Sequence, residues 1–78
     1  DYTYRLPALF KATSTFSGTT GTTITHNLNT TDYVVSVTPI GKNSLTYVGE
    51  ISIEKGTNTV TIYNSGSSNP QFDCIILK

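Results

Sequence analysis

Side chains that can take part in catalysis are few in this sequence. His26 is the single histidine, Cys74 is the single cysteine, and five residues carry carboxylates. A Ser-His-Asp hydrolase needs a histidine base that a carboxylate orients next to a nucleophile, and no serine here lies in a G-x-S-x-G motif. We therefore expect His26 to cap a turn or to bond to the backbone. The alternative is a hydrolase fragment, which predicts loss of an activity when His26 is replaced by alanine.

Two carboxylates, Glu50 and Glu54, lie four residues apart in a segment with strand periodicity. An even separation places them on one face of a strand, roughly 13 Å apart at the backbone. This distance exceeds the separation that glycosidase carboxylate pairs use. Approach of Asp73 to one of them across a sheet stays open. The preferred interpretation is a set of solvated charges that discourage pairing at a sheet edge.

Cys74 alternates with Phe72 and Ile76, and no basic residue adjoins it in sequence to lower its pKa. We expect a buried, unreactive thiol. One histidine and one cysteine do not complete a structural zinc site, and the carboxylates are too dispersed for a calcium cage. The sequence therefore predicts a protein that is not an enzyme, with no metal and no cofactor.

The size and composition of the chain limit its class. Seventy-eight residues make one domain, which buries only about 60% of its unfolded surface. A single cysteine allows no internal disulfide, so we expect oligomerisation or attachment to a larger protein to supply stability. The net charge is zero without a basic cluster, which argues against a nucleic-acid partner. No apolar run approaches the ~20 residues of a membrane helix, so we expect no membrane insertion.

Threonine makes up about one residue in five, and β-branched residues favour strands over helices. Alternating apolar and polar residues with turn signals between them predict six strands, at 8–17, 22–25, 33–38, 45–55, 59–64 and 71–77. Such short, regularly spaced strands are typical of an antiparallel sandwich or barrel. We expect the strands at 22–25 and 33–38 to form a hairpin through the polar turn 28–32. Val48-Gly49 predicts a bulge or a close backbone approach in the fourth strand.

Two of the predicted strands carry apolar side chains on both faces. Val34 lies on the face of strand 33–38 opposite to the more apolar one, and Ile75 and Leu77 lie opposite Cys74 on strand 71–77. A strand with two apolar faces is expected between sheets or at a subunit contact. We therefore predict that Val34, Ile75 and Leu77 line a subunit interface.

The first seven residues differ from the rest. Tyr2, Tyr4 and Leu6 alternate ahead of a proline that biases Leu6 to extended geometry. We interpret 1–7 as an extended arm or a linker from a preceding domain, and 8–78 as a single β-sandwich domain. The three side chains are predicted to pack on a neighbouring subunit or on the preceding domain. A frayed terminus is the alternative.

Carbohydrate binding is the specific binding function that the residues suggest. Lectin sites use an exposed aromatic ring to stack on a sugar and amide or carboxylate side chains to bind its hydroxyl groups. Tyr47 and Tyr63, with Asn43 and Asn64, are the candidates for such a site. Tyrosine is also an ordinary strand residue, so these four positions form a hypothesis that a structure has to test.

Three phrases of the sequence carry a family resemblance. They are T-I-T-H-N-L-N from Thr23, Y-V-V-S-V-T-P from Tyr33, and V-T-I-Y-N-S-G from Val60 followed by F-D-C-I-I. In this order they resemble the small C-terminal β-sandwich modules of bacteriophage and prophage tail fibres and tailspikes, and in outline the H-type lectin domains. The resemblance covers roughly 22–77. It implies a trimeric virion protein that attaches to a host-surface glycan, located in the phage tail or outside the cell.

Together these observations predict a small antiparallel β-sandwich of about six strands that forms a trimer. Its expected work is non-enzymatic, namely to hold three chains together and to attach to a bacterial surface glycan. The alternative is a monomeric, lectin-like carbohydrate-binding module of a secreted bacterial protein. A trimeric mass in solution favours the first, whereas a stable monomer with glycan affinity favours the second.

Overall fold

A computed structural model describes residues 9–41 and 47–77 of the chain. Within these ranges the chain forms six strands and no helix. The strands are β1 (Phe10–Thr15), β2 (Thr22–Thr25), β3 (Val34–Ile40), β4 (Ile51–Lys55), β5 (Thr59–Asn64) and β6 (Gln71–Leu77). The predicted arm at 1–7, with Tyr2, Tyr4 and Leu6, lies outside the described residues.

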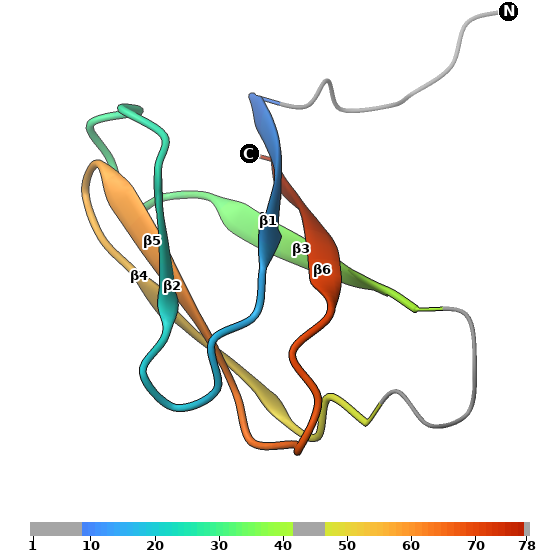
Figure 1. The fold of residues 1–78 in the computed structure, drawn as a ribbon. Helices are drawn as coiled ribbons and strands as arrows, with labels where there is room; N and C mark the ends of the chain where they lie inside the picture. The colour runs from blue at the N-terminus through green and yellow to red at the C-terminus, as the bar shows by residue number, and fades with distance from the viewer. Residues whose placement is uncertain (1–8, 42–46, 78) are drawn as a thin grey trace, which may run out of the picture.

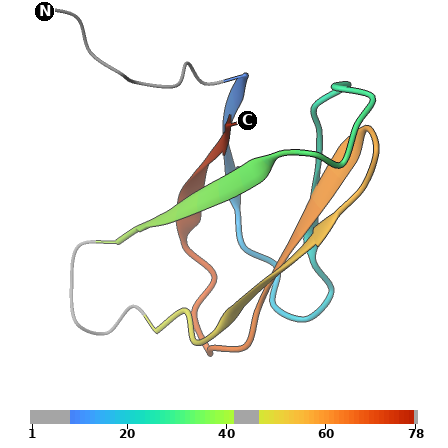
Figure 2. The same cartoon turned by 180° about the vertical axis from the view of Figure 1, so that it is seen from behind.

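The strands form two three-stranded antiparallel sheets, seen from opposite sides in Figures 1 and 2. Sheet A has the order β1-β6-β3, and sheet B has the order β2-β5-β4. The prediction of an all-β antiparallel fold with about six strands is therefore confirmed. In sheet A the first and last strands are neighbours, because Phe10 pairs with Ile76.

The expected hairpin between the second and third strands is wrong. β2 pairs with β5 in sheet B, where Ile24 lies opposite Val60, whereas β3 pairs with β6 in sheet A, where Val37 lies opposite Cys74. Each strand presents one apolar row to the core, and the two rows cover opposite sides of it. The connection at 26–33 is therefore a corner between the sheets, not a hairpin turn.

This corner is built on two asparagines with positive φ, Asn27 at 56° and Asn29 at 58°. Asparagine tolerates the left-handed region better than most residues. The resulting loop docks on the turn between β4 and β5, where the backbone N–H groups of His26 and Asn27 both donate to the carbonyl of Asn58, at 2.9 and 3.1 Å. These bonds continue the β2–β5 pairing to the tip of the β4–β5 hairpin, after which the chain crosses from sheet B to sheet A.

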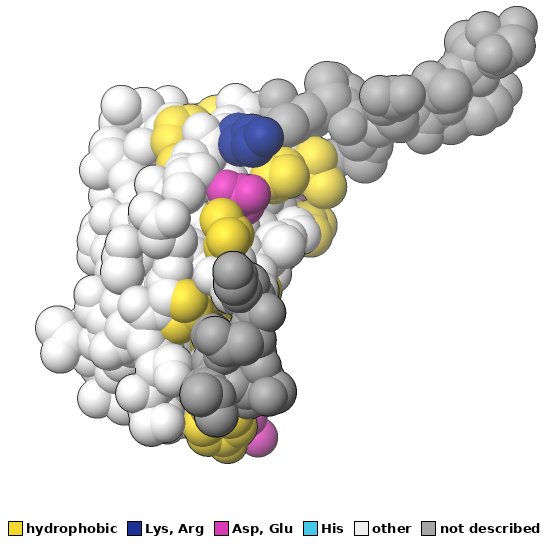
Figure 3. Space-filling view, turned by 45° about the vertical axis from the view of Figure 1, so that its right-hand side comes forward, with side chains coloured by type: hydrophobic (Ala, Val, Ile, Leu, Met, Phe, Trp, Pro, Cys, Tyr) yellow, Lys and Arg dark blue, Asp and Glu magenta, His cyan; other side chains and the backbone are white. Residues whose placement is uncertain are grey.

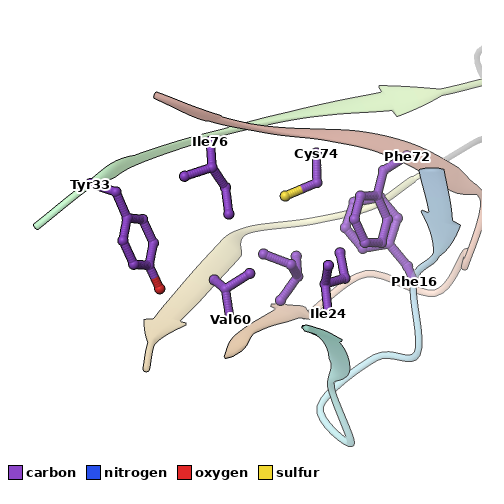
Figure 4. Close-up of a cluster of buried hydrophobic side chains, with 8 residues drawn as sticks. Phe16, Ile24, Tyr33, Val60, Phe72, Cys74 and Ile76 are labelled. Atoms are coloured by element: carbon purple, nitrogen blue, oxygen red, sulfur yellow. The ribbon is translucent and has the colours of Figure 1, made fainter. Parts of the chain in front are cut away.

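The core lies between the two sheets, and Figure 4 shows it extending from Tyr33 at one end to Phe16 and Phe72 at the other. Phe16 and Phe72 pack with ring centroids 4.6 Å apart. The buried hydrophobic residues are Phe16, Ile24, Tyr33, Val60, Ile62, Phe72, Cys74 and Ile76. The predicted inward faces of these strands are confirmed, because every second residue of β5 and β6 is buried.

The fourth strand is regular over a shorter range than predicted. Its ladder begins at Ile51, and the segment before it bonds instead to the loop after β5, through Gly66 N to Val48 O (2.6 Å) and Ser65 N to Glu50 O (3.0 Å). Gly49 has φ +79°, and a Cβ added there would meet the backbone of Gly66. The predicted close backbone approach at Val48-Gly49 is therefore confirmed.

Candidate functional site

His26 is buried, and both of its ring nitrogens are bonded inside the fold. Nδ1 accepts the backbone N–H of Leu28 at 3.0 Å, so the ring proton of the neutral imidazole is on Nε2. Nε2 lies 3.1 Å from the hydroxyl oxygen of Tyr33 and donates to it. The Tyr33 hydroxyl in turn donates to the Gly56 carbonyl at 2.9 Å. The predicted role of His26 in capping a turn is confirmed.

Tyr33 is the centre of this polar cluster. Its ring meets the His26 ring edge to face at 4.8 Å between centroids. Lys55 Nζ donates to the Tyr33 carbonyl at 2.9 Å and lies 5.4 Å from the Tyr33 ring centroid, a cation–π distance. Burial raises the pKa of the Tyr33 hydroxyl. The arrangement keeps the hydroxyl protonated and fastens the corner to the β4–β5 hairpin.

The carboxylates considered for acid–base chemistry do not meet. Asp73 lies on β6 in sheet A and accepts the Thr13 hydroxyl at 2.7 Å. Glu54 lies on β4 in sheet B, exposed, and accepts the Tyr63 hydroxyl at 2.8 Å. Both point to the outer face of their own sheet, so the core separates them. An approach of Asp73 to Glu54 across one sheet, which the sequence left open, does not occur, because β6 and β4 belong to different sheets.

Cys74 is fully buried as a free thiol. Burial raises its pKa above the ordinary value of 9.0, so the thiolate that nucleophilic chemistry needs is disfavoured. In the described part of the chain no three His, Cys, Asp or Glu side chains gather as metal ligands. Those residues enclose no pocket either.

The four predicted sugar-binding residues are not brought together at one site. Tyr47 is 62% exposed, and Tyr63 lies half-buried on β5. Asn43 lies outside the described residues. Asn64 departs from its prediction, because its side chain is 2% exposed and cannot reach a ligand at the surface.

Asn64 instead joins three segments of the chain. Its side-chain oxygen accepts the Gly18 N–H at 2.7 Å, and its NH₂ group lies 3.3 Å from the Val48 carbonyl and 3.1 Å from the Ser68 carbonyl. The side-chain oxygen of Asn69 is a further acceptor at 3.2 Å. Backbone N–H and C=O groups inside a fold need hydrogen-bond partners. The Asn64 side chain supplies such partners to loops whose backbone is not paired with a strand.

The three predicted interface residues of the described chain do share a face. Val34 lies directly opposite Leu77 in the β3–β6 register, and Ile75 lies two residues before Leu77 on the same side of β6. Leu9, 42% exposed, lies just before β1 and extends this group. We call these four residues the apolar face of sheet A. Its exposed fraction is largest at Val34, with 62%.

Figure 3 shows this side of the molecule, where hydrophobic side chains gather over β1, β6 and β3 beside one basic and one acidic group. Lys11 pairs with Ile75, and Thr13 pairs with Asp73, so Lys11 and Asp73 are diagonal neighbours on that outer face. Sequence reasoning missed Leu9 and Lys11 as part of it. The signal was present in the alternation of Leu9 with Phe10, but the pairing of β1 with β6 was needed to use it.

The outer face of sheet B has a different chemistry. Its paired rows consist of Thr25 with Thr59, of Thr23, Thr61 and Glu54, and of Tyr63 with Ser52. We call these seven residues the hydroxyl face of sheet B. The hydroxyl groups of Thr23 and Thr61 bond to each other across the strands at 3.1 Å. The alternation of apolar and polar residues predicted which residues of β5 point outward. It does not predict which residues of β2 and β4 lie beside them, because that depends on strand pairing.

Comparison with known proteins found no matching family model, no similar curated protein and no similar solved structure. The described residues contain no helix of sufficient length and apolarity to cross a membrane. The resemblance to phage tail modules therefore stays a prediction.

Proposed function

We propose that this chain is a non-enzymatic module that associates as a trimer and attaches to a bacterial surface glycan, as part of a phage tail fibre or tailspike. The observation that carries the proposal is the apolar face of sheet A, where Leu9, Val34, Ile75 and Leu77 lie together on an outer surface. An apolar group of this kind on a small domain is typical of an interaction surface.

The trimer is supported by the size of the domain and by the chemistry of that face. The core of a 78-residue chain without a disulfide is small, and burial of a second apolar layer between copies adds stability. Lys11 and Asp73 flank the layer with opposite charges, which allows copies to pair basic with acidic groups at its rim. The number of three copies and the location in a virion come from the family resemblance.

The test compares variants of the two outer faces by light scattering after size exclusion. Val34→Asp places a charge on the most exposed residue of the proposed contact, so the mass is expected to fall from three chains to one. Thr25→Asp, the control, adds the same charge to the hydroxyl face of sheet B and is expected to keep the mass of three chains. If the Val34 variant stays trimeric and folded, the apolar face of sheet A is not the interface.

A monomeric lectin-like module is the second candidate. The exposure of Tyr47 and the half-buried position of Tyr63 support it, because aromatic side chains on an outer surface are available for stacking on a sugar. A stable monomer that binds a glycan through one chain is the expected result for this candidate. A trimer whose glycan binding requires assembly contradicts it.

A further inference from the structure

We propose that the hydroxyl face of sheet B is the glycan-binding surface, with Tyr63 as the stacking ring, and that its ligand is a neutral polysaccharide chain. This inference rests on the attachment half of the proposed function and names its site and ligand class. It does not depend on the trimer.

Tyr63 is fixed at two points. Its ring lies over Gly21, because a Cβ added to Gly21 would lie 2.6 Å from Cε1 and 2.9 Å from Cδ1 of the ring. Its hydroxyl donates to Glu54 Oε1 at 2.8 Å, and this bond to a carboxylate raises the pKa of the tyrosine hydroxyl. A ring held in one orientation loses little entropy when a ligand stacks on it.

The groups around the ring are those that bind sugar hydroxyls. Ser52 lies directly opposite Tyr63, and Thr61 lies opposite both Thr23 and Glu54. Hydroxyl groups donate and accept hydrogen bonds, and the carboxylate of Glu54 has a second oxygen that accepts. An aromatic ring beside such groups matches a sugar, which has an apolar C–H face and hydroxyl groups along its edges.

The shape and charge of the face narrow the ligand class. Small molecules are usually bound in concave pockets, and the described residues enclose none, so an extended chain that lies across the strands fits this surface better. Glu54 is the one charged residue in the paired rows of this face. An acidic sugar would meet this carboxylate without a cation to offset it. A neutral polysaccharide avoids that repulsion.

The experiment uses affinity electrophoresis of the full chain in gels that contain dextran, mannan or galactan, with polygalacturonate as the acidic comparison. We expect retardation by at least one of the neutral polymers and none by polygalacturonate. Tyr63→Ala is expected to weaken binding about tenfold, because it removes the ring on which the sugar stacks. Tyr63→Phe keeps the ring but loses its anchor on Glu54, and a loss of a few fold is expected.

Ile40→Ala is the control, since Ile40 is an exposed large side chain on β3 of sheet A, away from the hydroxyl face of sheet B, and it is expected to bind as the unmodified chain does. Far-ultraviolet circular dichroism checks that each variant is folded. Full binding by a folded Tyr63→Ala variant, or preferential binding of polygalacturonate, overturns the site while glycan attachment itself stands. Retardation by none of the polymers overturns both the site and the attachment half of the proposed function, whereas the mass in solution tests the trimer separately.

Discussion

Asn64 shows how one residue decides whether two loops stay in place. Its amide supplies an acceptor to Gly18 and donors to the carbonyls of Val48 and Ser68. From sequence, an asparagine next to a serine-rich loop suggested a surface ligand site, because asparagine is common in exposed loops. The residue is buried instead because it ends β5 on the inward side, in the row of Val60 and Ile62. Alternation already contained that signal.

We predict that Asn64→Asp destabilises the fold by about 2–4 kcal/mol, because at this buried residue an oxygen replaces the NH₂ group that faces two backbone carbonyls. Chemical denaturation at pH 7 measures the change in the free energy of unfolding. The matched control is Asn69→Asp, which keeps the acceptor oxygen that faces Asn64 on an exposed residue. We expect less than about 1 kcal/mol for that variant. Equal losses from the two variants would contradict the structural role of Asn64.

Cys74 and Tyr33 predict how stability changes at alkaline pH. Burial raises the pKa of both groups above their ordinary values of 9.0 and 10.0, so the folded state holds their protons more tightly than the unfolded state. Their contribution is complete below about pH 9 and is lost as the pH rises through the folded-state pKa values. The free energy of unfolding is therefore expected to fall as the pH rises above about 9.

Urea denaturation with a reductant present measures this fall in the free energy of unfolding. The Cys74→Ala variant is expected to show a shallower fall with pH, even though the cavity left by the thiol lowers its stability at pH 7. The comparison uses the slope against pH, so the cavity term cancels. A slope that the Cys74 variant leaves unchanged would show that the thiol does not titrate with folding.

The positions of the strands were easier to predict than the pairing between them. Alternation placed the inward rows of β1, β5 and β6 correctly, since every second residue of a strand shares a face. The pairing was harder, because Phe10 meets Ile76 from the far end of the chain, and no local pattern encodes such a partner. The hairpin expected at 22–38 failed for the same reason. A polar turn between two strands does not say whether they share a sheet.

The segment before β4 carries a prediction about backbone contact. Gly49 and Gly18 both have positive φ, at +79° and +66°. An added Cβ meets the Gly66 backbone at Gly49, but it meets nothing within 4 Å at Gly18. Gly18→Ala is expected to cost about 1–2 kcal/mol, the price of the left-handed region for a residue with a Cβ.

Gly49→Ala is expected to cost at least about 1 kcal/mol more than Gly18→Ala, because the loop at 65–68 has to move as well. Thermal unfolding of the two variants measures the difference. Similar melting temperatures would show that the contact between Gly49 and Gly66 is loose.

At the scale of the whole molecule, the two sheets turn different chemistry outward. Sheet A presents Leu9, Val34, Ile75 and Leu77, whereas sheet B presents threonines with Tyr63 and Glu54. The sequence predicted most of the first face, because two strands were apolar on both sides. It predicted only part of the second, because the threonines of β2 and β5 are far apart in the chain and become one surface through pairing.

Under the proposed function the two faces have different roles, with association assigned to sheet A and attachment to sheet B. The proposal then requires the apolar face of sheet A to be buried between copies and the hydroxyl face of sheet B to point outward. Neither role requires chemistry at His26 or Cys74, whose side chains are used inside the fold.

The most direct test is the mass of the unmodified chain in solution, measured by light scattering on a size-exclusion column over a range of loading concentrations. The proposed function predicts a constant mass of three times the 8.4 kDa of one chain. A folded chain that keeps the mass of a single copy at every concentration would contradict association through sheet A and leave the monomeric carbohydrate-binding module in its place.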